Sequence, residues 1–263
     1  IASSLGLTAA IAGTLYIGEI WGFFGQIPWN NISNSGMIVV PLFILMGELL
    51  LRSGVTEELY SILSKWMGRV PGGLLHTNVL ASGLFASICG SSVATTSTIG
   101  AVALPEMRRH GYDEKLAMGS ITAGGTLGIL IPPSVIMIIY AIMAEVSIAQ
   151  LYMAGILPGL LMMAAFMLVI LLAALISPKS APRLPTLYSW SERIRGLTAV
   201  LPVLFLLGMV MGTIYAGVAT PTEAAGFGSV GAFLLALIKR RVNTIMLRDV
   251  FLATASTTSM VLL

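Results

Sequence analysis

The sequence predicts an all-α polytopic membrane protein. Only 10% of its 263 residues are charged, 57% are hydrophobic, and the mean hydropathy is +0.95. A soluble domain carries about 25% charged residues. This chain therefore has too little charge to cover a water-facing surface, and lipid must surround most of it. Long apolar runs separated by short charged segments are typical of membrane helices.

The basic residues indicate how the chain is threaded through the membrane. The turns near Glu19, Glu145 and Glu223 carry acids but no bases. The positive-inside rule explains this segregation better than nucleic-acid binding does, so we expect the basic clusters to be cytoplasmic and no nucleic acid to be a partner. The four clusters, which hold all 14 basic residues, are Arg52, Lys65 and Arg69; Arg108, Arg109 and Lys115; Lys179, Arg183, Arg193 and Arg195; and Lys239, Arg240, Arg241 and Arg248.

The first part of the chain, residues 1–70, reads as membrane helices followed by a surface helix. Ile1–Ile17 predicts a helix that leaves the cytoplasm, and Glu19–Ser35 predicts an external connection. Met37–Leu51 predicts the return span. Thr56–Met67 is amphipathic and charged, so we expect it to lie along the cytoplasmic surface.

A re-entrant helical hairpin is predicted over residues 71–105. Bases flank this apolar segment on both sides, which requires an even number of crossings or none. One straight helix would run about 52 Å, which is too long for a hydrocarbon core of about 30 Å, and two full spans need roughly 40 residues plus a turn. We therefore predict one arm over Leu74–Cys89, a tip at Gly90-Ser91-Ser92 and a second arm that ends at Leu104.

A broken membrane helix is predicted over Leu116–Ala144. Lys115 and Glu145 flank it, so it crosses once, yet a straight helix of this length would run about 43 Å. Glycines and a Pro-Pro pair interrupt it between positions 124 and 133, and both residue types support a helix poorly. With the hairpin, this helix makes up a predicted transport core over residues 71–150.

The last part, residues 151–263, predicts further membrane helices. Leu151–Ile176 returns inward, Ser177–Arg195 is a cytoplasmic connection, and Leu197–Tyr215 crosses outward. Thr222 is a candidate cap for a helix that runs back to Lys239. The chain starts and stops inside apolar runs, so we expect it to be a fragment of a longer protein.

A hairpin tip that meets a broken helix is a recurring way to build a secondary-transporter site. A helix that ends at Gly90 exposes carbonyls that suit Na⁺, and one that begins near Ser92 exposes N–H groups that suit an anion. Hydroxyl oxygens and breaks in the second helix add further ligands. The sodium ligands predicted in this way are Gly90, Ser91, Ser92, Thr95, Gly125, Thr126, Gly128 and Pro132. The predicted substrate-binding residues are Ser91, Ser92, Thr95, Thr96, Pro133 and Ser134.

Other interpretations of the same residues remain open. Gly124 and Gly128 have the GxxxG spacing that permits close helix packing. Glu48 is the only acid well inside a predicted span, and its i,i+4 spacing favours an ion pair with Arg52. Cys89 is the only cysteine and there are two histidines, so a disulfide framework or a histidine-based centre is not expected.

Several motifs in fixed order closely resemble the large membrane subunit (DctM type) of tripartite ATP-independent periplasmic (TRAP) transporters. Each motif alone is weak evidence, whereas the ordered series over nearly the whole chain is strong. The motifs are PLFILMGE (41–48), GGL (72–74), GSSVAT (90–95), ALPEM (103–107) with GYD (111–113), GGTLGILIPPS (124–134), AGILPG (154–159) and TPTEAA (220–225).

The resemblance implies a sodium-coupled, elevator-type transporter of the bacterial inner membrane and not an enzyme. It implies a small membrane subunit (DctQ type) and a periplasmic binding protein as partners, and an organic acid of the C4-dicarboxylate or sialic acid type as substrate. Family members carry a second, inverted repeat with its own hairpin and sodium site, which we expect to lie outside this sequence.

Three alternatives stay open. A two-component sodium/anion symporter would need no binding protein. An intramembrane hydrolase could use Ser91 or Ser92 as nucleophile, but it would need a base at the depth of the tip, where none is predicted. A membrane subunit without a transport role would tolerate substitution of Ser92 or Pro133.

Overall fold

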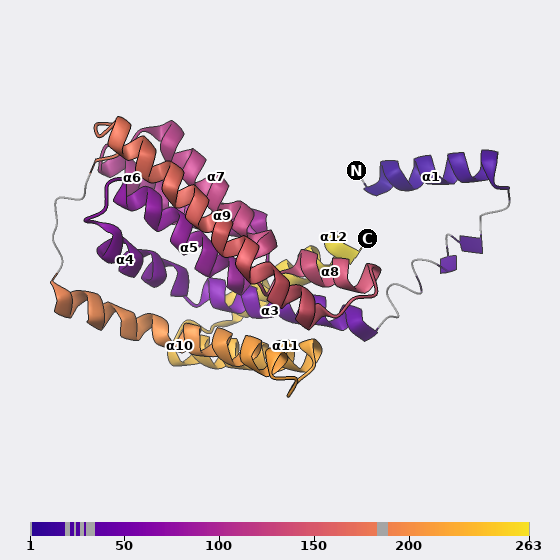
Figure 1. Cartoon of the computed structure of the whole chain (residues 1–263). Helices are drawn as coiled ribbons and strands as arrows, with labels where there is room; N and C mark the ends of the chain where they lie inside the picture. Colours follow the sequence, from indigo (N-terminus) through magenta and orange to yellow (C-terminus); the bar gives the residue numbers. More distant parts are fainter. Residues whose placement is uncertain are drawn as a thin grey trace.

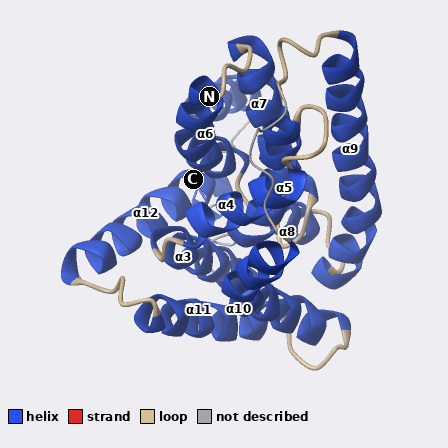
Figure 2. Cartoon of the chain, turned by 90° about the vertical axis from the view of Figure 1, so that its left-hand side faces the viewer, coloured by secondary structure: helices blue, strands red, loops and turns tan. Residues whose placement is uncertain are grey.

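The computed structural model describes residues 2–18, 22–23, 25–26, 29, 35–182 and 189–262, and every regular element in these ranges is a helix (Figure 2). The predicted external connection, Glu19–Ser35, lies largely outside the described residues. The elements are α1 (Ala2–Tyr16), the 3-10 helix η1 (Ser35–Ile38), α3 (Val39–Arg52), α4 (Val55–Met67), α5 (Gly73–Cys89), α6 (Ser92–Arg109), α7 (Glu114–Leu130), α8 (Val135–Met143), α9 (Ile148–Ile176), α10 (Trp190–Tyr215), α11 (Pro221–Ile238) and α12 (Thr244–Leu262).

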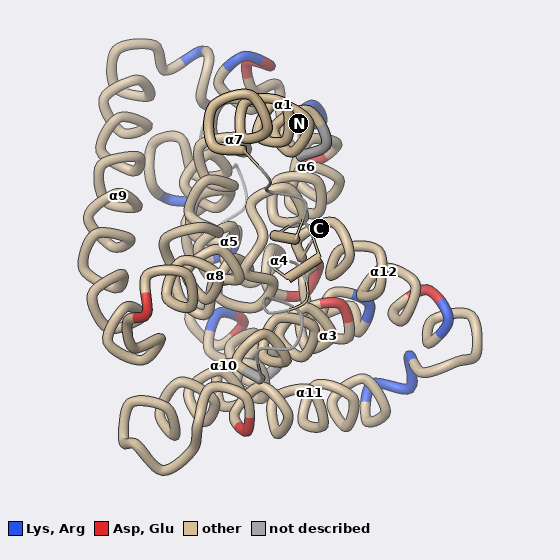
Figure 3. Tube along the Cα trace, turned by 90° about the vertical axis from the view of Figure 1, so that its right-hand side faces the viewer, with Lys and Arg blue, Asp and Glu red and all other residues tan. Residues whose placement is uncertain are grey.

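The helices have the lengths and surfaces of membrane spans. In the described part of the chain four helical segments are long and apolar enough to cross a membrane, or up to six if each of two bent pairs counts as one span. Helix α9 carries no charged residue, and only 11% of its most apolar window is buried, so its outer face suits lipid. Figure 3 shows the charged residues mostly near helix ends and in loops.

Two groups of helices make up the fold (Figure 1). In the first group α5, α6, α7 and α9 pack side by side. In the second group α3 packs against α11 and α12, and α10 packs against α11. Helix α4 lies between the groups and contacts α5, α6 and α10. Its helical span is as predicted, and its apolar stripe, including Leu59 and Ile62, is buried.

The predicted hairpin is present as α5 and α6, joined by Gly90 and Ser91. Gly90 ends α5 with φ +59°, a left-handed conformation that glycine adopts readily, and its N–H donates to the Ala86 carbonyl at 2.8 Å. The side chain of Ser91 then accepts from the N–H of Ala94 at 3.4 Å and caps α6. The tip is therefore a tight link between two capped helix ends.

The second arm of the hairpin is longer than predicted. It continues through Pro105 to Arg109 instead of stopping at Leu104. Proline removes one backbone hydrogen bond, but Ala103 and Met107 on either side of it are fully buried, and this packing keeps the helix continuous.

The predicted break between α7 and α8 is confirmed, but it is narrower than expected. Residues 131–134, which include Pro132-Pro133, interrupt the helix. Gly124, Gly125 and Gly128 lie inside α7 and not in the break. Their lack of a side chain lets α7 approach the hairpin closely.

Two boundaries in the last third were predicted wrongly. Helix α10 begins at Trp190 and not at Leu197, because Ser189 and Glu192 form a capping box. The cap of α11 is Thr220 and not Thr222, since the Thr220 side chain accepts from the N–H of Glu223 in a second capping box. Residues 183–188 of the predicted connection lie outside the described residues.

Candidate functional site

The hairpin tip touches the break between α7 and α8. The Gly90 carbonyl accepts from the N–H of Val135 at 3.4 Å. A Cβ added to Gly90 would lie 2.9 Å from the Pro133 carbonyl oxygen, so no other residue fits there without movement. The two interrupted segments that the sequence singles out thus meet at one place.

Three glycines of α7 bring the helix against the hairpin. A Cβ on Gly128 would lie 3.0 Å from the Ser92 nitrogen, and one on Gly125 would lie 1.8 Å from the Thr96 Oγ1. A Cβ on Gly124 would lie 2.6 Å from the Ser82 Oγ. The GxxxG spacing therefore serves close packing, and this packing places α7 beside the start of α6.

Uncompensated oxygen atoms gather at the break. Pro132 and Pro133 have no N–H, so the carbonyls of Gly128 and Ile129 lack the donors that a continuous helix would supply. Ser134 is fully buried, and its hydroxyl has no hydrogen-bond partner among the described residues. A buried polar atom without a partner is costly. Neutral carbonyl and hydroxyl oxygens suit a hard cation such as Na⁺, and these residues therefore fit one.

The hydroxyls of the second arm lie at different depths. Thr95 is fully buried, and its Oγ1 donates to the Ser91 carbonyl at 2.7 Å. The Thr96 Oγ1 donates to the Ser92 carbonyl at 2.9 Å. Both oxygens keep lone pairs that can accept. Thr126 is exposed on α7 and donates to Ala123, so the structure does not bring it to the tip.

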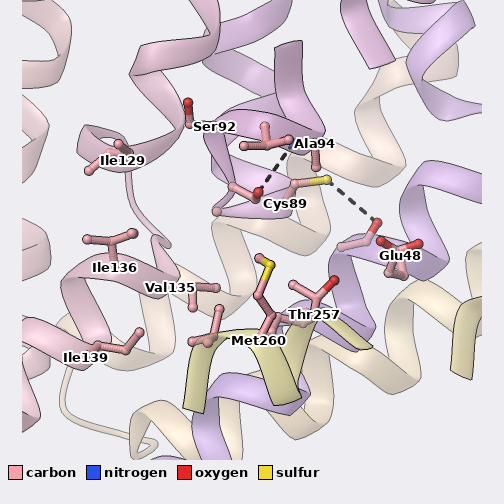
Figure 4. Close-up of a pocket in the computed structure, with 16 residues that line it drawn as sticks. Glu48, Cys89, Ser92, Ala94, Ile129, Val135, Ile136, Ile139, Thr257 and Met260 are labelled. Carbon is pink, nitrogen blue, oxygen red and sulfur yellow. Dashed lines mark hydrogen bonds between the residues drawn. The ribbon is translucent and has the colours of Figure 1, made fainter. Parts of the chain in front are cut away.

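A cavity of about 340 Å³ lies against the tip (Figure 4). Of the predicted substrate-binding residues, Ser91 and Ser92 line it. Thr95, Thr96, Pro133 and Ser134 are not among its lining residues. The lining comprises Cys89–Ala94 from the hairpin, Ile129 of α7, Val135, Ile136 and Ile139 of α8, Ile44, Gly47 and Glu48 of α3, and Thr257, Met260 and Val261 of α12.

Two polar residues of the cavity were not predicted to belong to a site. Glu48 forms the expected ion pair with Arg52, with 3.5 Å between Oε2 and Nε, and it also lines the cavity. Thr257 of α12 also lines the cavity, although it follows the hairpin tip by more than 150 positions in the sequence. The only sequence signal for it is the run of hydroxyl residues at 254 and 256–259 inside an apolar segment.

Comparison with known proteins places the chain in one family. The family model described as "Tripartite ATP-independent periplasmic transporter, DctM component" matches residues 1–263. The chain is 35% identical over 238 residues to the C4-dicarboxylate TRAP transporter large permease protein DctM of Pseudomonas aeruginosa, which covers 90% of this chain and 55% of that protein.

Other relatives have different substrates in their names. The chain is 32% identical to the sialic acid TRAP transporter large permease protein SiaM of Vibrio cholerae, over 92% of this chain and 56% of that protein. It is 31% identical to the ectoine TRAP transporter large permease protein TeaC of Halomonas elongata, over 86% of this chain and 52% of that protein. The chain spans about half the length of these curated relatives. Its motifs, its helical fold and these matches together show that the chain belongs to the DctM family of multi-pass TRAP transporter permeases, which are transport components and not enzymes.

Proposed function

We propose that the protein carries out sodium-coupled uptake of an organic acid across the inner membrane of a bacterium. A periplasmic binding protein delivers the acid, and a small membrane subunit of the DctQ type completes the system. Family membership and relatives named for C4-dicarboxylates, sialic acid, 2,3-diketo-L-gulonate and ectoine support this proposal. The contact between the hairpin tip and the Pro-Pro break is the observation that carries it.

The cation site of this proposal lies where the tip meets the break. Carbonyl oxygens of Gly90, Gly125, Gly128 and the Pro132 region, together with hydroxyls of Ser91, Ser92, Thr95 and Ser134, are its candidate ligands. Bound sodium supplies positive charge beside the tip, which favours an anion in the adjoining cavity. The buried Ser134 hydroxyl, which has no hydrogen-bond partner among the described residues, supports this assignment. So do the carbonyls of Gly128 and Ile129, because the residues four positions later are prolines without an N–H.

The anion site lies at the start of α6. The first backbone N–H groups of a helix have no intrahelical acceptor, and the helix dipole places partial positive charge there. Ser92 and Val93 begin α6 and both line the cavity. A substrate carboxylate can accept from these N–H groups and from the Ser91 and Ser92 hydroxyls.

The position of the cavity between the two helix groups supports an elevator-type movement in this proposal. The cavity lies between them, since α3 and α12 line one side, and the hairpin, α7 and α8 line the other. Gly54 joins α3 to α4 with φ +80° at a bend of 66°, a glycine conformation that suits a hinge. In this proposal the hairpin group moves past α3 and α12 and carries the bound acid.

Sodium activation of uptake tests the cation site. Ser134→Ala, Ser91→Ala and Thr95→Ala each remove one ligand, and each is expected to raise the sodium concentration for half-maximal uptake roughly tenfold, which corresponds to about 1.4 kcal/mol. Ser97→Ala is the matched control, because Ser97 is exposed and, among the described residues, its hydroxyl bonds only within α6. Unchanged sodium activation in all three variants would remove these residues from the site.

A further inference from the structure

Arg193, near the start of α10, is a buried arginine that forms no ion pair within the described part of the chain. Only 6% of its surface is exposed, and its Nε is shielded from solvent and donates no hydrogen bond there. The terminal guanidinium nitrogens are not shielded in this way, so a ligand can reach them. Arginine is rarely buried unless it is paired, because an uncompensated buried charge destabilises a fold. Arg193 therefore suits an anion from outside these residues.

The Arg193 side chain lies against a pair of tryptophans. Its guanidinium carbon is 5.5 Å from the centre of the Trp190 ring, and the Trp66 ring of α4 meets Trp190 edge to face, with 6.0 Å between the ring centres. The ring face attracts the cation but does not neutralise it. The Trp66 Nε1 is also shielded and donates no hydrogen bond among the described residues. Two N–H donors without acceptors thus accompany one indole ring, which favours a negatively charged ligand with several oxygen atoms.

The two helix ends that meet here carry an excess of positive charge. Helix α4 and the first turns of α10 lie side by side (Figure 1). Glu192 is the only acid in residues 65–69 and 189–195, and its carboxylate already accepts from the Ser189 N–H at 2.8 Å. A surface with this charge balance attracts anions. The four bases in the same residues are Lys65, Arg69, Arg193 and Arg195.

The surface next to Arg193 suits the acyl chains of a lipid. Trp190, Ile194 and Leu197 share one face of α10 at i, i+4 and i+7 spacing, and they are 63%, 58% and 41% exposed. Tryptophan is enriched where a membrane meets water, and basic clusters attract anionic lipids at the same depth. A phospholipid supplies both phosphate oxygens for the arginine and acyl chains for the apolar face.

We infer that Arg193 is the centre of a binding site for an anionic phospholipid. Its guanidinium donates to the phosphate oxygens, a pairing that suits arginine because its fork of N–H groups can bind two oxygens at once. The Trp190 ring lies at the level of the headgroup, and the acyl chains follow Ile194 and Leu197. The described residues that line the cavity at the hairpin tip include none of these, so the lipid site is separate from the proposed transport site. The bound lipid stabilises the contact between α4 and α10.

Native mass spectrometry of the full-length protein with its small subunit, in a maltoside detergent, tests the inference. Dioleoyl phosphatidylglycerol is titrated as the anionic probe and dioleoyl phosphatidylcholine as the neutral one. We expect a tightly bound phosphatidylglycerol that phosphatidylcholine does not replace at equal concentration. Arg193→Gln is expected to weaken this binding about tenfold. Arg248→Gln, which removes an exposed base of α12, should change it by less than about twofold.

Thermal unfolding separates the lipid from other anions. Phosphatidylglycerol should raise the melting temperature of the wild-type protein by about 3 °C and leave that of Arg193→Gln unchanged, and inorganic phosphate should raise neither. Arg193→Lys keeps the charge and should retain lipid binding even where Arg193→Gln folds poorly. Equal stabilisation by inorganic phosphate, or an equal loss of lipid binding in Arg193→Gln and Arg248→Gln, overturns the inference. Unchanged lipid binding by Arg193→Gln also overturns it, and loss of the small subunit from that variant on purification would then assign Arg193 to a subunit contact.

Discussion

Gly47 of α3 lies directly against the backbone of Cys89, the last residue of the first hairpin arm. A Cβ on Gly47 would lie 3.0 Å from the Cys89 Cα and 3.2 Å from the Ile88 carbonyl oxygen. The Cys89 Sγ in turn lies 4.0 Å from the Gly47 carbonyl oxygen. This contact joins the two helix groups beside the cavity, so a sliding movement of the hairpin has to pass it.

Gly47→Ala should therefore lower both the stability of the protein and its rate of uptake. The added methyl meets backbone atoms, which cannot rotate away, so α3 and the hairpin must separate, at a cost of about 1–3 kcal/mol. We expect a lower melting temperature in detergent and slower uptake at equal expression. Gly119→Ala in α7 is the control, because in the described part of the chain no atom beyond its own helical backbone lies within 4 Å of the added Cβ. Equal behaviour of the two variants would contradict the close contact.

Gly125→Ala should be destabilising in a way that depends on Thr96. Its Cβ would lie 1.8 Å from the Thr96 Oγ1 and 3.0 Å from the Thr96 Cβ. Removing the hydroxyl with Thr96→Ala relieves the closer of the two clashes. We therefore expect the double variant to recover about 1–2 kcal/mol relative to the sum of the single variants, measured as unfolding free energy. Purely additive effects would show that α7 does not approach α6 at this position.

Chain-length arithmetic predicted the architecture well for particular reasons. The 71–105 segment is too long for one span and too short for two, and Pro132-Pro133 cannot continue a helix, so the hairpin and the break followed directly. Gly124, Gly125 and Gly128 were harder, because glycine both weakens a helix and permits close packing, and only the neighbouring helix decides between these effects. Pro105 led to a wrong end for the second hairpin arm, because the burial of Met107 outweighs the hydrogen bond that the proline removes.

The candidate site was predicted only in part. Ser91 and Ser92 follow from local sequence, because they sit at a helix start next to a glycine. The lining residues Glu48 and Thr257 come from helices far away in the chain, and their positions depend on the packing of α3 against α12. Local patterns contain no information about such contacts.

Asn78 of α5 links its helix to three others. Asn78→Ala should lower the free energy of unfolding by about 2–4 kcal/mol, because it leaves the buried partners of Asn78 unpaired. Its Oδ1 accepts from the Tyr60 hydroxyl at 2.9 Å, and its Nδ2 donates to the Ser120 Oγ at 2.8 Å and to the Met107 Sδ at 3.1 Å. Thermal unfolding in detergent measures the effect. Gln150→Ala, which truncates an exposed amide on α9, should change stability by less than about 0.5 kcal/mol. A similarly small effect of Asn78→Ala would exclude the buried network.

Thr220 and Thr222 provide a matched pair for the cap of α11. The Thr220 Oγ1 accepts from the Glu223 N–H at 3.3 Å, and the Glu223 carboxylate accepts from the Thr220 N–H at 2.8 Å. Thr220→Ala should lower the unfolding free energy by about 1 kcal/mol, whereas Thr222→Ala should have little effect. The opposite order would restore Thr222 as the cap.

The most direct test of the central claim is uptake of labelled organic acids into proteoliposomes that contain the full-length protein and its small subunit. Uptake is measured with and without a sodium gradient, and with and without the cognate binding protein. We predict uptake only when both are present. Uptake driven by sodium without the binding protein would contradict the tripartite mechanism, and uptake without a sodium gradient would contradict the cation site at the hairpin tip.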